Sequence, residues 1–162
     1  PLGGDHFNQE ILNNIRRRNN FFVSLRTAGR LKTSLADLKQ ERKLARKIVG
    51  VDCVSGLPRE RIVTSTTINE SILSSVKEIA EEIRTFLDRT PPQIHKVILA
   101  EGIYLTGGST RIPYIAQVIS RQIGCPILLS QYYDLCTVYG LKEIITHDAL
   151  HHWAFTPKKR KK

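Results

Sequence analysis

The pattern that most constrains the fold is a long amphipathic run in the middle of the chain. Its apolar residues recur three and four positions apart, as on one face of an α-helix: Ile72, Leu73, Val76, Ile79, Ala80, Ile83, Phe86 and Leu87. Thr67-Ile68-Asn69-Glu70 before this run matches a capping box. Pro91-Pro92 ends it, because proline and the residue before it disfavour helical continuation. The sequence therefore predicts one amphipathic helix from about residue 67 to residue 90.

Two shorter helices and a hairpin are predicted upstream. In the first helix Asp5 is the expected N-cap, Phe7, Ile11, Leu12 and Ile15 form the apolar face, and Asn19-Asn20 marks the end. The second helix is expected from Ser24 to about Leu38, with Leu31, Leu35 and Leu38 on one face. Alternating residues on both sides of the turn Ser55-Gly56-Leu57-Pro58 then predict a β-hairpin: Val49, Val51 and Cys53 before the turn, and Ile62, Thr64 and Thr66 after it.

Downstream, short strands alternate with helices. A loop is expected after Pro91-Pro92, followed by a strand at Ile103-Tyr104-Leu105 and a helix that begins near Pro113 and ends at Gly124. The apolar face of that helix holds Ile115, Val118, Ile119 and Ile123. A further strand is expected at 127–129 and a last helix from Asp134 through Ile145. The predicted order α-α-β-β-α-β-α-β-α indicates an α/β protein with βαβ character in its second half.

Gly107, Gly108, Ser109 and Thr110 connect the expected strand at 103–105 to the helix after it. Glycine tolerates positive φ and lets a ligand approach the backbone, and a helix N-terminus favours phosphate. The segment has no Lys, so it is not a Walker A loop, and it does not match G-x-G-x-x-G. The local pattern alone favours a structural turn over a nucleotide-binding loop.

The net charge of +10 comes from two regions. Residues 16–47 hold eleven Lys or Arg against Asp37 and Glu41, and residues 158–162 are all basic. Such a patch could hold phosphates or an anionic membrane surface. Interleaved aromatic residues and a base-reading motif are missing, so nucleic acid is not the expected partner. A solvated helical face is the simpler interpretation of the basic segment.

No residue pattern indicates catalysis or a metal site. Cys53, Cys125 and Cys136 form no C-x-x-C pair, which favours three reduced thiols. His147 and His151 have i, i+4 spacing, but no third metal ligand is evident near them. No Ser-His-Asp or Cys-His arrangement can be argued, and no apolar run is long enough to span a membrane. The sequence offers no self-contained catalytic site.

Several segments, in order, resemble the second half of the MreB family, the rod-shape-determining bacterial actin homologues. They are GGDHFNQEILNNIRRRNN, RTAGRLK, VSGLPRERIVTS, LDRTPPQI, GIYLTGGSTRIPYI, IGCPILLS and DLCTVYGLKEI, which together cover about Gly3 to Ile145. The phrase TGGSTRIP is similar to the heat-shock chaperone ATPases of the same actin-like superfamily. The TPP after the long helix and the SGLP turn favour the MreB family.

The resemblance implies the C-terminal half of an actin-like ATPase fold (ribonuclease H-like). Residues 3–66 would form a small α+β lobe, 67–150 part of the large nucleotide-binding subdomain, and 151–162 a basic tail. The parent protein would bind ATP and Mg²⁺ between two lobes and polymerise into filaments that determine cell shape. It would be cytoplasmic, in contact with membrane-associated cell-shape machinery. The alternatives are a chaperone-type ATPase, and a basic module that binds nucleic acid or anionic lipid.

The resemblance also implies site residues. Gly107, Gly108, Ser109, Thr110 and Arg111 would line the nucleotide, and Gly29, Arg30, Leu31 and Lys32 would face the adenosine. Gly29 stands where the family usually has an acidic residue, which removes an expected acceptor for the ribose hydroxyls. The family's phosphate loops and metal-binding acids would lie upstream of Gly3. The chain alone is therefore expected not to hydrolyse ATP and to expose an edge of the large subdomain's sheet, which strands upstream of Gly3 would complete. The change at Gly29 argues against strong nucleotide binding, and the resemblance leaves open whether this half binds nucleotide alone.

Overall fold

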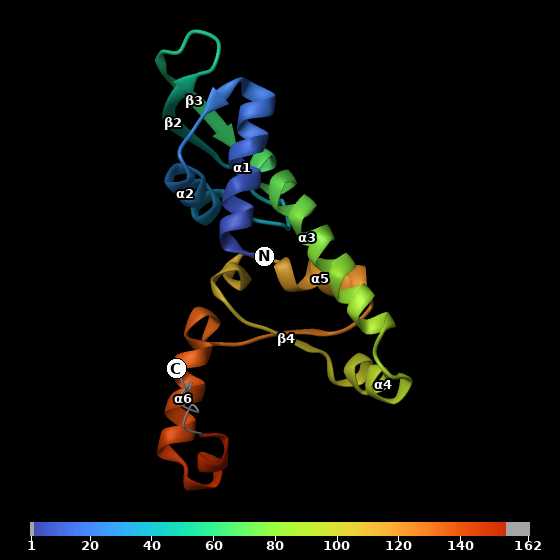
Figure 1. The fold of residues 1–162 in the computed structure, drawn as a ribbon. Helices are drawn as coiled ribbons and strands as arrows, with labels where there is room; N and C mark the ends of the chain where they lie inside the picture. The colour runs from blue at the N-terminus through green and yellow to red at the C-terminus, as the bar shows by residue number, and fades with distance from the viewer. Residues whose placement is uncertain (1, 155–162) are drawn as a thin grey trace, which may run out of the picture.

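The computed structural model describes residues 2–154 as two groups of elements joined by one long helix (Figure 1). The first group contains α1 (Gly4–Asn19), α2 (Leu25–Leu35) and an antiparallel sheet of β1 (Phe21–Phe22), β2 (Ala45–Asp52) and β3 (Pro58–Thr64), in that order. α3 (Ser65–Asp88) leads to the second group, which contains α4 (Pro92–Glu101), β4 (Ile103–Leu105), α5 (Ile115–Ile123), β5 (Ile127–Leu129) and α6 (Cys136–Thr146). β4 and β5 pair in parallel. Three 3-10 helices complete the fold: η1 (Gly108–Arg111), η2 (Tyr133–Leu135) and η3 (Asp148–Trp153).

The first helix follows its predicted pattern except at its N-cap. All four apolar residues of its face are buried, and the helix ends where Asn20 adopts a left-handed conformation with φ of 48°. The prediction of Asp5 as the N-cap is wrong, because Gly3 occupies that position without a side-chain cap. Asp5 lies instead within the first turn, where its carboxylate interacts favourably with the helix dipole.

The long helix α3 begins two residues earlier than predicted. Ser65 starts it directly after β3, because the Ser65 N–H donates to the Leu44 carbonyl oxygen and fixes the strand-to-helix turn. The predicted capping box at Thr67–Glu70 is therefore wrong: Thr67 lies inside the helix, and the Glu70 carboxylate pairs with Arg18 at 2.6 Å. Its apolar stripe packs inward except at Phe86, which is 69% exposed.

Other elements also differ from the predictions. α2 begins at Leu25 with Ser24 as its N-cap, one residue after the predicted start, and it ends at Leu35 instead of Leu38. Leu38 is buried from the following loop. The hairpin forms, although Cys53 and Thr66 lie outside its strands. The loop predicted after Pro91-Pro92 is instead the helix α4, since proline is compatible with a first helical turn.

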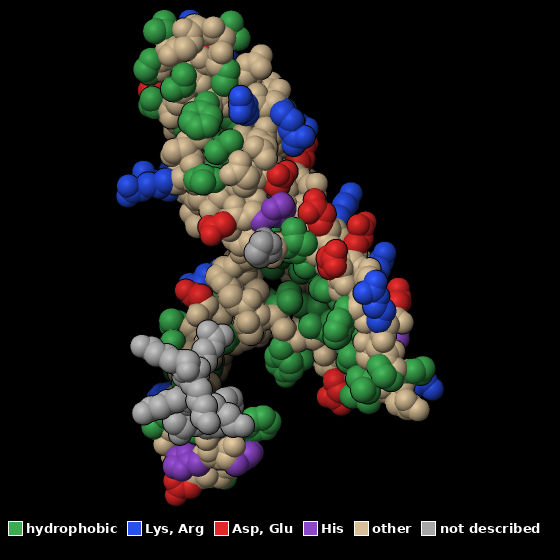
Figure 2. Space-filling model, in the orientation of Figure 1, with side chains coloured by type: hydrophobic (Ala, Val, Ile, Leu, Met, Phe, Trp, Pro, Cys, Tyr) green, Lys and Arg blue, Asp and Glu red, His purple; other side chains and the backbone are tan. Residues whose placement is uncertain are grey.

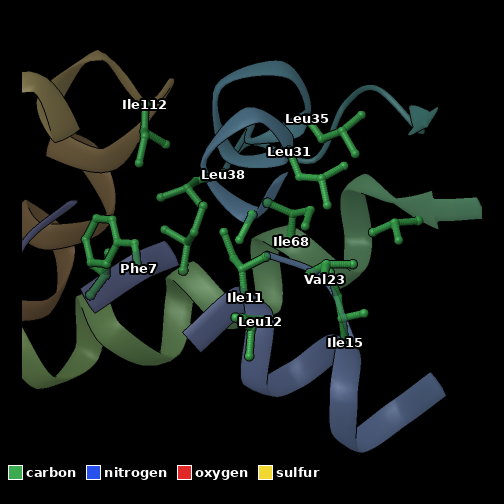
Figure 3. Packing of buried hydrophobic residues seen from close by; sticks show 14 of the residues in the cluster. Phe7, Ile11, Leu12, Ile15, Val23, Leu31, Leu35, Leu38, Ile68 and Ile112 are labelled. Carbon is green, nitrogen blue, oxygen red and sulfur yellow. The ribbon is translucent and has the colours of Figure 1, made fainter. Parts of the chain in front are cut away.

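One hydrophobic cluster links the two groups of elements (Figure 3). Phe7 and Ile11 from α1, Leu31 from α2 and Ile68 from α3 meet there, and Ile112 reaches the same cluster from the second group. The predicted boundary at residue 66 falls in the first turn of α3, and the division into two lobes stays a prediction. Most of the predicted tail at 151–162 lies outside the described residues.

Apolar side chains remain exposed at both ends of the molecule. Figure 2 shows them around the hairpin turn and near the junction of α3 and α4. Val54 and Leu57 in the hairpin turn and Phe86, Ile94 and Val97 at the junction are all more than half exposed. Among the described residues, no helix combines the length and the apolar character that crossing a bilayer requires.

Candidate functional site

A pocket of about 500 Å³ lies where the start of α1, the C-terminal end of α2 and the segment at η1 meet. Segments 29–32 and 107–111, which the family resemblance implied as site residues, both contribute to its lining. Its lining consists of Gly4, Lys32, Thr33, Ala36, Gly108, Ser109, Arg111, Ile112 and Pro113. The fold thus brings Lys32 of α2 to the glycine segment, although the two are far apart in sequence.

The glycine pair has two different roles in this turn. Gly107 has φ of 98°, a conformation that side-chain-bearing residues rarely adopt. Its N–H donates to the Tyr133 carbonyl oxygen at 3.0 Å, and its own carbonyl oxygen accepts from the buried Thr110 hydroxyl at 2.6 Å. Gly108 has no positive φ, and a Cβ atom there would meet only Asp134, at 3.9 Å. The turn requires the positive φ that glycine provides at position 107, whereas Gly108 lines the pocket with backbone that no side chain covers.

Lys32 carries a positive charge into the pocket. Its Nζ atom donates to the Gly4 carbonyl oxygen at 2.8 Å and lies 6.0 Å from the centre of the Phe7 ring. Burial lowers the pKa of Lys32, and the nearby Asp5 carboxylate opposes that shift. A Cβ atom on Gly4 would lie 3.3 Å from Ser109 Oγ and 3.4 Å from Lys32 Nζ. Glycine at this position therefore lets α1, α2 and η1 converge.

Arg111 is held at the rim by two partners. Its guanidinium donates to Asp134 Oδ1 at 2.6 Å and lies 5.0 Å from the centre of the Tyr133 ring. The hydrogen bond from Arg111 lowers the pKa of the Asp134 carboxyl. Both contacts hold the guanidinium toward η2, whereas Lys32 lines the pocket from α2 with its Nζ atom on the Gly4 carbonyl oxygen.

Of the segment 29–32, which the family resemblance places against the adenosine, only Lys32 lines this pocket. Leu31 is 3% exposed in the hydrophobic cluster, and Gly29 faces Asn8, whose side-chain nitrogen would lie 3.6 Å from an added Cβ atom. Arg30 lines a separate groove between α2 and β2. The structure thus joins Lys32 with Gly108, Ser109 and Arg111, while Gly107 and Thr110 shape the turn behind them.

Five lining residues were not singled out in the sequence: Gly4, Thr33, Ala36, Ile112 and Pro113. Ala36, the C-cap of α2, lies four positions after Lys32, so helical spacing could have found it, whereas Thr33 directly follows Lys32 and is not placed on the same face by that spacing. Gly4 gives no such signal, because its place depends on how α1 meets η1. Among residues 2–154, no three His, Cys, Asp or Glu side chains lie in a group that could hold a metal ion.

Comparison with known proteins identifies relatives along most of the chain. The family model described as MreB/Mbl protein matches residues 1–152. The cell shape-determining protein Mbl of Bacillus subtilis is 31% identical over 140 residues, which are 86% of this chain and 42% of that relative. The cell shape-determining protein MreB of Pasteurella multocida is 28% identical over 153 residues, which are 93% of this chain and 44% of that relative. The chain thus spans less than half the length of these relatives.

Solved structures give the same fold. MreB5 of Spiroplasma citri bound to AMPPNP superimposes with a TM-score of 0.83 at 28% identity, over 88% of this chain and 43% of that chain. The MamK double helical filament, at 17% identity and a TM-score of 0.63 over 96% of this chain and 45% of that chain, supports the fold alone. The predicted α/β actin-like fold is confirmed. The chain belongs to the MreB/Mbl family of bacterial actin-like proteins.

Proposed function

We propose that the chain is part of a bacterial cytoskeletal protein that binds ATP, assembles into filaments and takes part in cell-shape determination. Within it, the pocket between α1, α2 and η1 would receive the adenosine part of the nucleotide. The relatives named above are cell shape-determining proteins, and the MreB5 structure holds AMPPNP. These likenesses support the proposal for the whole protein, of which this chain spans less than half the length of its relatives.

The observation that carries the proposal is the convergence of Lys32 with Gly108 and Ser109 on one pocket. Bare backbone at Gly108 lets a planar base or a ribose approach closely. Ala36, Ile112 and Pro113 add apolar surface to the same lining, and adenine presents an apolar face. The Lys32 ammonium can donate to a ribose or phosphate oxygen in addition to the Gly4 carbonyl oxygen, because it has three hydrogen-bond donors.

Hydrolysis is not proposed for these residues. In the family resemblance, the phosphate loops and the Mg²⁺-binding acids belong to segments upstream of Gly3. Mg²⁺ takes oxygen ligands and usually contacts nucleotide phosphates, so its site would form with those segments. The pocket here supplies affinity and orientation for the adenosine end.

A calorimetric titration of ATP and Mg²⁺ into the purified chain tests the site. We expect saturable binding that weakens at least about tenfold in Lys32→Met, because a hydrogen bond from a charged group contributes about 1.5–3 kcal/mol. The matched control is Lys96→Met, which removes an exposed cation from α4 and should leave the affinity unchanged.

Adenosine should compete with ATP in the same titration, since the proposed contacts are at the adenosine end. Failure of the wild-type chain to bind either compound would contradict a working half-site in this chain. Equal weakening by the two lysine variants would assign binding to general charge attraction instead of the pocket.

A further inference from the structure

Strand β2 is paired along only part of one edge. On one side β3 pairs with it from Ala45 to Val51. On the other side β1 contains only two residues, Phe21 and Phe22, which lie opposite Asp52 and Val51. The chain then leaves the sheet, because Val23 is buried in the core and Ser24 caps α2 by accepting from the Thr27 N–H at 3.2 Å. Residues 45–49 of β2 therefore have an open edge, since Gly50 still lies against Phe21 and Phe22.

The backbone groups at this edge follow from the alternation of an antiparallel ladder. The Asp52 N–H donates to the Leu57 carbonyl oxygen across the hairpin at 3.0 Å, whereas the Cys53 N–H donates to the Asn20 carbonyl oxygen toward β1 at 2.8 Å. Because successive residues of a strand turn their N–H and C=O groups to opposite sides, Lys47 and Val49 direct theirs to the open edge. Within residues 2–154, neither N–H has a backbone acceptor.

A groove of about 440 Å³ runs between this edge and α2. Its two walls are Thr27, Arg30, Leu31, Thr33 and Ser34 from the helix, and Arg46, Lys47, Ile48 and Val49 from the strand. Four consecutive strand residues in the lining show that the groove follows the direction of β2. An extended segment lying in it could take the place of a neighbouring strand and pair with β2.

The charge of the groove favours an acidic occupant. Arg30, Arg46 and Lys47 line it, and no carboxylate is among the lining residues. Lys47 pairs with Glu60 of β3, but within the described residues Arg30 and Arg46 form no ion pair. Arg42 and Lys43 precede the strand and extend the positive region. Complementary charge suits segments rich in Asp or Glu.

We propose that the open edge of β2 binds an extended acidic segment of a partner protein, which adds to the sheet as a further strand beside α2. Backbone hydrogen bonds to Lys47 and Val49 supply affinity, and Arg30 and Arg46 select acidic side chains. This interaction accounts for part of the basic segment at residues 16–47. It is separate from nucleotide binding, because the groove and the Lys32 pocket have only Thr33 in common.

The test is a titration of the full chain with a capped peptide of alternating glutamate and valine, followed by amide NMR shifts and hydrogen exchange. We expect saturable binding with shifts and slowed exchange at the amides of Lys47 and Val49. A peptide of alternating glutamine and valine should bind more weakly, because it loses the charge pairing. A glutamate–valine peptide with N-methylated backbone should not bind, because it cannot pair with the strand.

Variants of the chain separate charge from backbone pairing. Arg30→Gln and Arg46→Gln should each weaken peptide binding about threefold, within the range of exposed ion pairs, and Arg84→Gln on α3 should not. Val49→Pro removes an N–H that faces the open edge and should weaken binding at least about fivefold, whereas Val49→Thr keeps it. The N-methylated peptide decides the same question if Val49→Pro does not fold.

Three results would overturn the proposal. One is equal binding of the native and N-methylated peptides. Another is competition by inorganic polyphosphate without any protection of the Lys47 and Val49 amides, which would make the groove a general polyanion site. The third is a concentration-dependent dimer of this chain that protects the same amides without peptide, which would assign the edge to self-pairing.

Discussion

The Gly50→Ala variant is expected to lose about 3 kcal/mol or more of its free energy of unfolding. A Cβ atom built on Gly50 would lie 2.4 Å from the Phe22 carbonyl oxygen and 2.6 Å from Phe21 Cε1. Neither neighbour can yield easily, since one is backbone and Phe21 is 0% exposed in the core. Forcing atoms into a packed site typically costs about 1–3 kcal/mol and sometimes more. Chemical denaturation followed by circular dichroism measures the loss.

A matched control for this substitution is Gly140→Ala. Gly140 lies inside α6, where a Cβ atom would meet nothing within 4 Å. Alanine is favoured over glycine in a helix by about 0.5–1 kcal/mol, so this variant should not lose stability. Wild-type stability of Gly50→Ala would mean that β1 does not lie against β2 as described, and would also remove the short strand that limits the open edge.

The helices of the first group could be predicted because each has one apolar face. Phe7, Ile11 and Ile15 repeat at helical spacing and are all buried, as expected. α4 was missed for the opposite reason: Ile94, Val97, Ile98 and Leu99 lie around much of a ten-residue helix, and none of its residues is buried. A helix without a single apolar stripe gives no clear helical period in the sequence. The two prolines before α4 were interpreted only as the end of α3.

The candidate site could be predicted in part. Lys32, Gly108, Ser109 and Arg111 came from the family resemblance, and the structure places all of them on one pocket. Gly4 could not be found, because its role depends on the approach of Ser109 and Lys32 from other elements. The open edge of β2 was equally hidden, since the length of β1 is set by the burial of Val23 and the start of α2, and alternation along β2 does not reveal it.

The Asn69→Leu variant is expected to lower the free energy of unfolding by about 2–4 kcal/mol. Asn69 is 1% exposed on α3, and its amide makes two hydrogen bonds to the backbone of Asp37. Oδ1 accepts from the Asp37 N–H at 3.0 Å, and Nδ2 donates to the Asp37 carbonyl oxygen at 2.8 Å. Leucine of similar size leaves both backbone groups without these partners, at about 1–3 kcal/mol each. Asn19→Leu, at an exposed position of α1, is the control and should change stability by no more than about 0.5 kcal/mol.

The same substitution should also loosen the candidate nucleotide pocket. Asp37 follows α2, which carries Lys32, and the next residue, Leu38, donates its N–H to the Pro113 carbonyl oxygen at 3.2 Å. Asn69 therefore holds the short segment that ties one wall of the pocket to the other. At a temperature where Asn69→Leu remains folded, ATP should bind it more weakly than the wild-type chain, whereas Asn19→Leu should bind normally. Reduced stability with unchanged ATP affinity would show that this segment supports the core without positioning the pocket.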